Sequence, residues 1–368
     1  MDLDAACTAL AAALAGTGPA IELAPDGTAV PVRAPGLAPG TAAVVRTSGS
    51  TGTPKATMLG RAALAASTAA TAARLGGEGQ WLLALSPNYV AGLQVLVRSV
   101  HAGSRPVAMD LSARFTAAGF TQAAAALTHR FRITSLVPTQ LHRLLADPAA
   151  ETIKALRRFD TILLGGARAP QDLLAAARRH GLKLVRTYGM SETCGGCVYD
   201  GVPLDGVRVR LDGGRIVLGG PVVASGYLGN PELTAAHFSH DPDGTAWFRT
   251  EDLGGLDGGL LSVAGRADDV LITGGVKVSA AAVAAAIETV PGVDAVLVAG
   301  VEDPEWGTRV ACAVVGRAPA QRIRDTVRAA LGPAAAPRTV LVLDELPLLS
   351  NGKPDRLAVA RMLQAAAG

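Results

Sequence analysis

A loop rich in glycine and hydroxyl side chains, closed by a lysine, is the part of the chain best suited to bind a phosphate. It runs from Thr47 to Thr57, and six of its eleven residues carry a hydroxyl group. Glycines let backbone N–H groups turn toward an anion, hydroxyls donate further hydrogen bonds, and a lysine adds a point charge. The spacing is not that of a Walker A loop, because Lys55 follows Pro54 and precedes Ala56. The predicted phosphate-binding residues are Thr47, Ser48, Gly49, Ser50, Thr51, Gly52, Thr53 and Lys55.

The segments around this loop predict how it is positioned. Residues 41–46 have the pattern of a strand and residues 61–75 that of a helix, so Lys55 is expected to close the loop just before a helix. From residue 81 to 164 apolar strand candidates alternate with helical segments, which is typical of an α/β domain with a mostly parallel sheet. Short strands separated by Gly/Asp turns follow residue 200, and an α+β pattern follows residue 267. We predict a domain over residues 1–266 and a second over 267–368.

Further motifs follow in a fixed order and carry a resemblance to a known family. They are Leu164–Ala167 (LGGA), Tyr188–Glu192 (YGMSE), Gly226–Thr234 (GYLGNPELT), Phe248–Leu253 (FRTEDL), Gly265–Asp269 (GRADD) and Asn351–Arg356 (NGKPDR). With the loop at 47–57, they make the chain resemble the acyl-adenylate-forming superfamily of acyl-CoA synthetases, peptide-synthetase adenylation domains and luciferases. The resemblance implies a large N-terminal domain of mixed and parallel sheets with a β-rich subdomain, and a small, mobile α+β C-terminal domain.

The resemblance also implies a reaction with two halves. A carboxylate attacks the α-phosphate of ATP to give an acyl-adenylate and pyrophosphate, and a thiol, usually that of coenzyme A, then displaces AMP. Two unit negative charges 4 Å apart repel by ~4 kcal/mol at an effective dielectric constant of ~20, so cations must stand near the reacting groups. The expected catalytic residues are Lys353, which bridges the carboxylate and the α-phosphate, Glu192, which holds Mg²⁺, and Ser191, whose hydroxyl reaches the α-phosphate.

The remaining motifs imply nucleotide, hinge and thiol contacts. Asp252 would accept hydrogen bonds from the ribose hydroxyls with Arg266 beside it, and Asp268 would mark the hinge about which the C-terminal lobe rotates. Gly274 and Gly275 would line the coenzyme A tunnel, since only glycine lets a pantetheine arm pass so close to the backbone. The residues expected around the adenine are Gly165, Gly166, Ala167, Tyr188 and Gly189.

The acyl substrate is suggested by the position of the loop, which begins at residue 47 and leaves little room for the N-terminal subdomain usual in the superfamily. Such a short chain resembles the o-succinylbenzoate–CoA ligases of bacterial menaquinone biosynthesis. That substrate has two carboxylates, of which one is activated and the other must be held. Arg98 is a candidate partner for the second one, and the alternative is an ordinary surface arginine on a helix. Asn88, Tyr89 and Gly92 are the other expected acyl-pocket residues, with Asn88 or Tyr89 where relatives often carry an aromatic or His gate.

Three other functions stay open as alternatives. The chain could be another aryl- or acyl-CoA synthetase. A stand-alone adenylation enzyme could load a carrier protein instead of coenzyme A, and a catalytically silent chain could only bind a nucleotide. The segment 81–98 lacks the Asp that an amino-acid-activating domain uses for the substrate ammonium, and no carrier segment is expected after residue 356. Glu251, where the superfamily usually has Gly, is a departure from its pattern.

Composition excludes several other classes. The net charge is +3 and there are only 6 Phe, 3 Trp and 4 Tyr, so a stacking platform for nucleic acid is not expected. No apolar run is long enough to span a membrane, and Asp2 and Asp4 precede the first apolar stretch, so we expect a cytoplasmic protein without a signal peptide. Cys194 and Cys197 have CxxC spacing without a second pair to complete a zinc site, and we interpret them as pocket-lining thiols. The oligomeric state stays open, with a homodimer as one alternative.

Overall fold

The chain divides into two compact units in its computed structural model, which describes residues 2–48, 54–304, 306–349 and 353–367. The larger unit consists of residues 1–210, 217–250 and 257–261, and the smaller unit of residues 211–216, 251–256 and 262–368. The domain boundary after residue 266 stays a prediction, because this division assigns some earlier residues to the smaller unit. Within the described residues no helix is both long and apolar enough to cross a bilayer.

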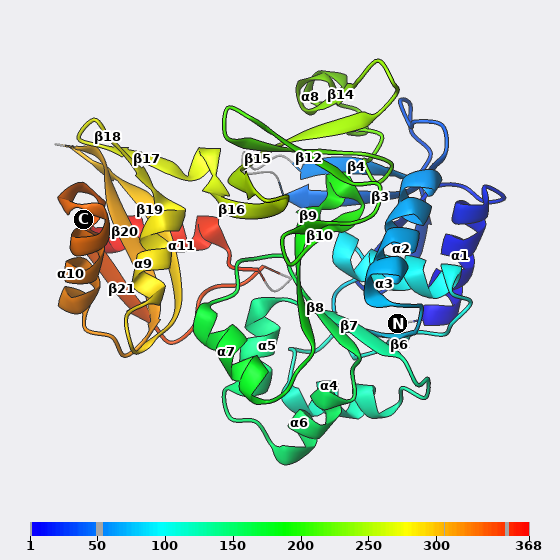
Figure 1. Ribbon diagram of the computed structural model, residues 1–368, viewed down its shortest axis with the longest axis horizontal. Helices are drawn as coiled ribbons and strands as arrows, with labels where there is room; N and C mark the ends of the chain where they lie inside the picture. Colours follow the sequence, from blue (N-terminus) through cyan, green and yellow to red (C-terminus); the bar gives the residue numbers. More distant parts are fainter. Residues whose placement is uncertain (1, 49–53, 305, 350–352, 368) are drawn as a thin grey trace. The chain divides into compact units, whose positions relative to one another are not determined.

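The larger unit is built on a seven-stranded sheet of order β11-β10-β9-β8-β7-β5-β6 (Figure 1). Strands β5 to β9 run parallel, and β10 and β11 extend one edge antiparallel. This arrangement matches the mostly parallel sheet expected from the alternating pattern. The strands are β5 (Gln80–Leu83), β6 (Val107–Ala108), β7 (Arg132–Leu136), β8 (Thr161–Leu164), β9 (Leu184–Met190), β10 (Gly195–Tyr199) and β11 (Val202–Pro203).

Helices cover both faces of this sheet because successive side chains on its strands point to opposite faces. Leu82, Leu136 and Ile162 belong to a core cluster that also contains side chains of α4 to α7. Helix α3 packs on β5, β7 and β10, and α2 packs on α3 and β10. The helices are α2 (Arg61–Leu75), α3 (Val90–His101), α4 (Ala117–Ala125), α5 (Pro138–Leu145), α6 (Ala150–Arg157) and α7 (Gln171–Arg179).

A second sheet of order β2-β1-β3-β4 carries the predicted phosphate loop. The antiparallel pair β3–β4 places Thr47 opposite Lys55, so Lys55 lies in a strand. The expectation that Lys55 closes a loop before a helix was therefore wrong: α2 begins only at Arg61, after the seven residues of β4. The composition up to Thr57 is typical of a loop, which conceals the strand. The elements are α1 (Leu3–Ala15), β1 (Ile21–Leu23), β2 (Ala29–Pro31), β3 (Thr41–Ser48) and β4 (Pro54–Gly60).

The region after residue 200 forms the expected β-rich part. Its sheet has the order β12-β13-β15-β14, and β16 pairs with β15. The long strand β15 contributes residues to both compact units, since residues 251–256 belong to the smaller one. The elements are β12 (Arg208–Asp212), β13 (Arg215–Gly219), α8 (Pro231–His237), β14 (Phe238–His240), β15 (Ala246–Asp257) and β16 (Leu260–Arg266).

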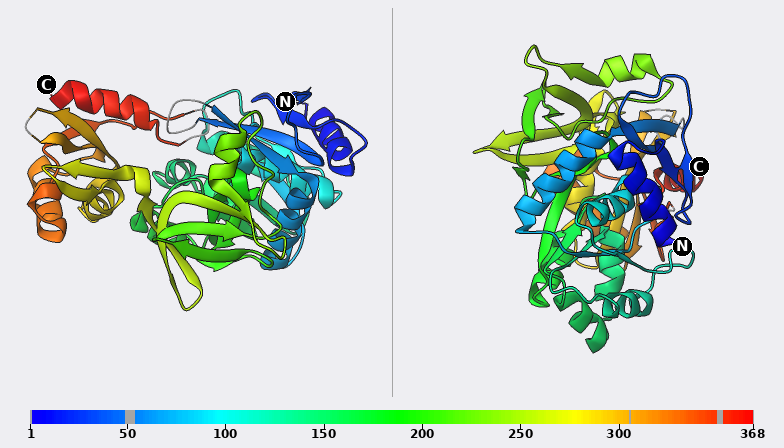
Figure 2. Two further views of the ribbon diagram at one scale, coloured as in Figure 1. Left: turned by 90° about the horizontal axis from the view of Figure 1, so that it is seen from above. Right: turned by 90° about the vertical axis from the view of Figure 1, so that its right-hand side faces the viewer.

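The C-terminal α+β region has a three-stranded sheet of order β19-β20-β21 with helices on both faces (Figure 2). Val298, Cys312 and Val314 face α9 and α10, while the neighbouring Leu297 and Ala311 face α11. The elements are β17 (Val270–Thr273), β18 (Val276–Ser279), α9 (Ala280–Glu288), β19 (Val293–Asp303), β20 (Gly307–Gly316), α10 (Ala320–Leu331), β21 (Thr339–Leu343) and α11 (Arg356–Ala367), with single 3₁₀ turns η2 (Ala267–Asp269) and η3 (Pro333–Ala335).

Candidate functional site

Several predicted site residues follow the carboxyl ends of neighbouring parallel strands. Asn88 and Tyr89 lie between β5 and α3, Gly165 follows β8, and Glu192 follows β9 in the 3₁₀ turn η1 (Ser191–Thr193). Ligands of open α/β sheets bind at this edge because parallel strands all end there. The structure therefore brings the predicted adenine, metal and acyl residues to one edge of the larger unit's sheet.

The predicted phosphate loop is described only at its two ends. Gly49, Ser50, Thr51, Gly52 and Thr53 lie outside the described residues. Thr47 and Ser48 end β3, and Lys55 stands near the start of β4. The described ends of the loop are thus held by the β3–β4 ladder.

The glycines of the predicted adenine site stand where a Cβ would clash or where the backbone has a positive φ. A Cβ on Gly165 would lie 2.2 Å from Thr187 Oγ1, and one on Gly189 would lie 2.1 Å from the carbonyl oxygen of Gly195. Both distances are below 3.0 Å, which real Cβ atoms essentially never show. At Gly189 the clashing atom belongs to the backbone, whereas at Gly165 it belongs to a threonine side chain. Gly166 has φ +82°, a conformation that glycine adopts without strain. Ala167, beside it, is exposed, and Tyr188 is half-buried on β9.

Glu192 is a buried carboxylate with a defined hydrogen-bond donor. It is 9% exposed, and its Oε1 accepts a hydrogen bond of 2.7 Å from the Tyr227 hydroxyl. The Tyr227 ring in turn lies under Lys55, whose Nζ is 5.5 Å from the ring centroid. Ser191, the preceding residue, is 3% exposed. The residue expected to hold the metal and the lysine of the phosphate loop therefore contact the same tyrosine.

A single carboxylate at this position suits magnesium better than a transition metal. No group of three or more His, Cys, Asp and Glu side chains that could hold a metal exists among the described residues. Mg²⁺ needs no such cage, because it is usually held by one or two carboxylates together with phosphate oxygens and water. Since Oε1 is engaged by Tyr227, Glu192 would offer Mg²⁺ its other carboxylate oxygen. The donor set thus fits a Mg²⁺ ion that arrives with ATP.

The expected ribose and hinge residues form one ion-pair network in the smaller unit. Arg266 makes a two-pronged contact with Asp268, at 2.7 Å from both Nε and Nη2, and its Nη1 lies 3.8 Å from Asp252 Oδ1. These hydrogen bonds to Arg266 hold the pKa of Asp268 below its ordinary value. Arg356, at the start of α11, bonds to Asp269 at 2.6 Å, while burial raises the pKa of Asp269. The structure therefore places Arg266 beside Asp252, as expected from the motifs.

Glu251 has a structural reason to depart from the superfamily's glycine. It forms an ion pair with Arg215 on the neighbouring strand β13. Both side chains are only about one-third exposed, at 27% and 30%, so the pair is partly shielded from water. Arg215 thus balances the negative charge that Glu251 adds beside Asp252.

The other predicted residues of the smaller unit lie on its surface. Lys353 is exposed, and its carbonyl accepts a 2.8 Å hydrogen bond from the Leu349 N–H, while Asn351 and Gly352 of its motif lie outside the described residues. Gly274 and Gly275 form the exposed turn between β17 and β18. A Cβ on Gly274 would lie 2.4 Å from the ring of Trp306, so that ring is one reason for the glycine. The tunnel role of both glycines stays a prediction.

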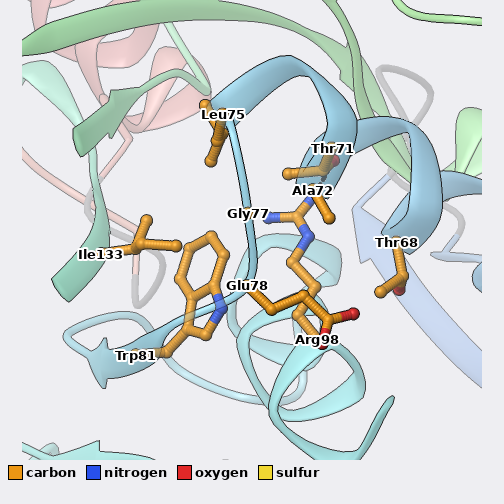
Figure 3. Close-up of a pocket in the computed structure, with 9 residues that line it drawn as sticks. All are labelled: Thr68, Thr71, Ala72, Leu75, Gly77, Glu78, Trp81, Arg98 and Ile133. Carbon is orange, nitrogen blue, oxygen red and sulfur yellow. Dashed lines mark hydrogen bonds between the residues drawn. The ribbon is translucent and has the colours of Figure 1, made fainter. Parts of the chain in front are cut away.

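Arg98 is buried, and the alternative of a surface helical arginine was wrong. It is 5% exposed, and its Nη2 donates to Thr71 Oγ1 at 3.2 Å and to the Tyr199 hydroxyl at 3.5 Å. Its guanidinium carbon lies 5.1 Å from the centroid of the Trp81 ring. Figure 3 shows Arg98, Thr71 and Trp81 around a small pocket, with Glu78 among the other residues that line it.

The Arg98 guanidinium keeps unused hydrogen-bonding capacity in this pocket. Its buried Nε has no hydrogen-bond partner among the described residues. Neither Thr71 nor Tyr199 is a carboxylate, so the hydroxyl contacts do not neutralise the buried charge. A buried cation of this kind favours an anionic ligand.

Local packing fixes the turn before α3, where the other expected acyl residues lie. Ser86 Oγ donates to Asn88 Oδ1 at 2.6 Å, and Tyr89 is the N-terminal cap residue of α3. A Cβ on Gly92 would lie 2.2 Å from the Ser86 carbonyl oxygen, so glycine is required where the helix passes under this turn. Asn88 and Tyr89 are both half-buried.

Comparison with known proteins gives the family. Residues 11–228 match the family described as AMP-binding enzyme, and residues 282–353 match the family described as AMP-binding enzyme C-terminal domain. The chain belongs to the AMP-binding enzyme family. The superfamily resemblance and the predicted α/β class, with a large N-terminal and a small C-terminal domain, are thereby confirmed.

Two relatives of this AMP-binding enzyme are named as ligases of the same acid. The chain is 49% identical over 330 residues to a probable 2-succinylbenzoate–CoA ligase of Mycobacterium tuberculosis. This match covers 87% of this chain and 84% of the relative. The chain is 34% identical to a 2-succinylbenzoate–CoA ligase of Bacillus velezensis, covering 73% of this chain and 57% of that one.

Solved structures share its fold. The o-succinylbenzoate CoA synthetase of Bacillus subtilis in complex with the acyl-adenylate intermediate OSB-AMP matches with a TM-score of 0.72 and 30% identity, over 87% of this chain and 69% of that one. An amide bond synthetase from Marinactinospora thermotolerans matches with a TM-score of 0.75 and 27% identity, over 92% of this chain and 72% of that one.

Sequence reasoning about this AMP-binding enzyme missed the neighbours of its key side chains. Tyr227 was part of a motif but had no role, and Thr71 and Tyr199 were not candidates. Tyr227 is 35 residues from Glu192 in sequence, and Tyr199 is 101 residues from Arg98. Only the GY motif could have pointed to Tyr227, since contacts across such separations depend on the fold.

The two CxxC cysteines of this AMP-binding enzyme are structural. Cys194 and Cys197 are free and fully buried, and burial raises the pKa of both thiols, that of Cys197 to about 12. Thiols with raised pKa values are protonated at pH 8, and the protonated form neither binds metal nor reacts with alkylating agents. The structure shows them buried, and the interpretation that they line a pocket stays a prediction.

We therefore expect Cys194 and Cys197 to resist iodoacetamide at pH 8 in the native protein. Cys7 is partly exposed and should be labelled faster, although burial raises its pKa as well. Mass spectrometry of peptides after timed labelling measures each rate, and unfolding in urea should expose all four thiols. Native labelling of Cys194 or Cys197 as fast as Cys7 would contradict the burial seen here.

Proposed function

We propose that the chain is an ATP-dependent 2-succinylbenzoate–CoA ligase. It converts o-succinylbenzoate, ATP and coenzyme A to o-succinylbenzoyl-CoA, AMP and pyrophosphate through an acyl-adenylate, a step of menaquinone biosynthesis. The observation that carries this choice of acid is the buried Arg98, in a chain 49% identical to a probable ligase of that name. Coenzyme A is a substrate, and ATP is used with Mg²⁺.

In the first half-reaction the chain must bring two anions together. The phosphate-loop residues Thr47–Thr53 and Lys55 hold the β- and γ-phosphates, and Gly165–Ala167 with Tyr188 and Gly189 surround the adenine. Asp252 accepts hydrogen bonds from the ribose hydroxyls, with Arg266 beside it at 3.8 Å. Lys353 bridges the attacking carboxylate and the α-phosphate, so it stabilises charge that develops only in the transition state.

Glu192 and Ser191 complete the phosphate site in this proposal. Glu192 would hold Mg²⁺, which neutralises phosphate charge when bound. The Ser191 hydroxyl donates to an α-phosphate oxygen. Both residues are buried, and η1 fixes them directly after β9.

In the second half-reaction Lys353 must leave so that the thiol can enter. Rotation about Asp268 exchanges Lys353 for the turn at Gly274 and Gly275, which then lines the coenzyme A tunnel. The Asp268 carboxylate accepts two hydrogen bonds from Arg266, and rotation about this residue has to rearrange that contact.

Arg98 determines which acid the proposed ligase accepts. Asn88, Tyr89 and Gly92 form the mouth of the acyl pocket, and the second carboxylate of o-succinylbenzoate is held by the Arg98 guanidinium. Two observations support this role: Arg98 Nε has no hydrogen-bond partner among the described residues, and Thr71, which accepts from Nη2, is uncharged. A charge-assisted hydrogen bond to a carboxylate is about twice as strong as a neutral one.

Two finer features belong to the same proposal. The protein acts in the cytoplasm, where ATP and coenzyme A are available. A homodimer is the alternative to a monomer, and light scattering coupled to size-exclusion chromatography distinguishes the two masses.

The function is tested with a panel of carboxylates scored for pyrophosphate release. We expect release with o-succinylbenzoate that requires ATP and Mg²⁺, and an acyl-CoA product when coenzyme A is present. Benzoate, 4-oxo-4-phenylbutanoate, malonate and amino acids are the competing acids, and a carrier protein and simple amines are the competing acceptors. Activity that does not saturate with coenzyme A but does so with a carrier protein would favour the carrier-loading alternative, and no pyrophosphate release with any acid would favour the silent one.

A further inference from the structure

Tyr227 is held rigidly between the strand that carries Lys55 and the turn that carries Glu192. It is 3% exposed and lies in a segment that pairs with β4. The Met58 N–H donates to the Gly226 carbonyl at 2.9 Å, and the Leu228 N–H donates to the Ala56 carbonyl at 2.8 Å. The backbone on both sides of Tyr227 is therefore fixed to the strand that follows the phosphate loop.

The other side of the Tyr227 ring is packed against aromatic side chains. Phe238 lies edge-on to it with a centroid separation of 5.3 Å, and both rings share a core cluster with Phe248. The Tyr227 N–H donates to Thr234 Oγ1 at 2.9 Å, which fixes the start of the side chain. With the backbone and the ring held in this way, the hydroxyl is directed at Glu192 Oε1.

This side chain contacts both groups that the proposed function assigns to metal and phosphate. The hydroxyl donates to Glu192 Oε1 at 2.7 Å, and the ring face lies 5.5 Å from Lys55 Nζ. No described residue other than Tyr227 bonds to the Glu192 carboxylate. One side chain thus orients an anion through its hydroxyl and a cation through its π-face.

We propose that Tyr227 is a positioning residue that sets the geometry of the Mg²⁺–ATP site. Its hydroxyl fixes one oxygen of Glu192, so that the other is presented to the metal, and its ring holds the Lys55 ammonium near the phosphate loop. The inference rests on the proposed roles of Glu192 and Lys55. Hydrogen-bond partners of metal ligands act in this way, and losing one typically costs 10–100-fold in metal affinity or activity.

The two contacts can be separated by choice of substitution. Tyr227→Phe removes the hydroxyl and keeps the ring under Lys55, whereas Tyr227→Leu removes both. We therefore expect Tyr227→Phe to weaken only the binding of the metal. Tyr227→Leu should weaken the binding of the metal and also the binding of metal-free ATP.

The experiment measures Mn²⁺, as a paramagnetic substitute for Mg²⁺, by electron paramagnetic resonance in the presence of ATP. For Tyr227→Phe we expect about a tenfold higher Mn²⁺ concentration for half-saturation, with calorimetric ATP affinity in EDTA unchanged. For Tyr227→Leu we expect the same loss, with ATP affinity in EDTA reduced about fivefold, in line with the usual strength of a cation–π contact. Neither readout depends on turnover.

A matched control removes a comparable bond elsewhere in the larger unit. Trp247 is 5% exposed and its Nε1–H donates to Asp241 Oδ2 at 2.6 Å, so Trp247→Phe also deletes an aromatic donor to a carboxylate. This variant should bind Mn²⁺ and ATP as the parent does, after thermal unfolding has shown that it is folded.

The inference would be overturned if a folded Tyr227 variant reached half-saturation at the same Mn²⁺ concentration as the parent. A double-mutant cycle gives a second check: on a Glu192→Gln background, Tyr227→Phe should cause no further loss of Mn²⁺ affinity, and an equal further loss would mean that the hydroxyl acts elsewhere. If the parent binds Mn²⁺–ATP but activates no acid, the proposed reaction fails while this test still reads out the role of Tyr227.

Discussion

Replacing Lys353 by alanine is expected to stop acyl-adenylate formation while leaving thioester formation intact. The ammonium is proposed to act only when carboxylate and α-phosphate approach, so its loss should slow that step by about 10²–10³-fold, as for the loss of one donor to a developing oxyanion. In the proposed second half-reaction Lys353 is withdrawn, so the rate with supplied acyl-adenylate should stay within about threefold of the parent.

The two halves are measured separately. Exchange of labelled pyrophosphate into ATP, with o-succinylbenzoate present, reports the first half. Conversion of synthetic o-succinylbenzoyl-adenylate and coenzyme A to the thioester reports the second. Lys154→Ala is the matched control, because Lys154 is an exposed lysine on helix α6 of the other unit, and it should leave both rates unchanged.

Equal losses in the two halves would refute this division of labour. The thermal stability of Lys353→Ala should match that of the parent, since the side chain is exposed. A folded variant that still exchanges pyrophosphate at the parental rate would move the catalytic charge to another residue.

The sequence predicted the architecture well where a local pattern decides it. The helix 61–75 was predicted to the residue, and the strand predicted at 41–46 extends to Ser48. Apolar periodicity and flanking Gly or Pro residues determine such elements.

The strand β4 could not be predicted because its pairing, not its composition, makes it a strand. Pro54, Lys55 and Thr57 have the composition of a loop, but β3 provides a ladder of hydrogen bonds along the whole segment. A strand is stabilised by its partner, and the partner is set by the fold.

The candidate site shows the same limit. The motifs named Glu192, Asp252 and Arg266 as candidates without any structure, since each stands in a short, ordered sequence signature. The environment of each side chain was not predictable: Arg98 was as compatible with the surface as with the interior until α2 and β10 were seen to enclose it. Motifs therefore predict chemistry, and burial decides how strongly a charge acts.

The largest effect on substrate choice is expected from Arg98→Met, which should raise KM for o-succinylbenzoate by about 10²-fold or more. Removing one partner of a desolvated charge pair costs about 2–5 kcal/mol, which converts to roughly 30- to 5,000-fold. Methionine keeps much of the side chain's volume under Trp81, so the loss reflects charge more than packing.

A mono-acid separates recognition of the second carboxylate from a general defect. The parent should use 4-oxo-4-phenylbutanoate, which lacks the ring carboxylate, poorly. Arg98→Met should use that mono-acid no worse than the parent does, because neither protein makes the contact in question. Arg98→Lys keeps the positive charge but not the planar guanidinium, so we expect a smaller rise in KM for o-succinylbenzoate than in Arg98→Met. Arg105→Met is the control, since Arg105 pairs with Asp4 on the surface and its side chain is 76% exposed.

These steady-state constants are compared with thermal unfolding of each variant, because Thr71 and Tyr199 lose their shared donor when Arg98 is replaced. A folded Arg98→Met enzyme that loses equal activity toward the diacid and the mono-acid would show that Arg98 is structural only. If instead only the diacid suffers, the ring carboxylate is the group that pairs with the guanidinium. A chain that buries an arginine beside neutral hydroxyls would then have done so because its substrate completes the ion pair.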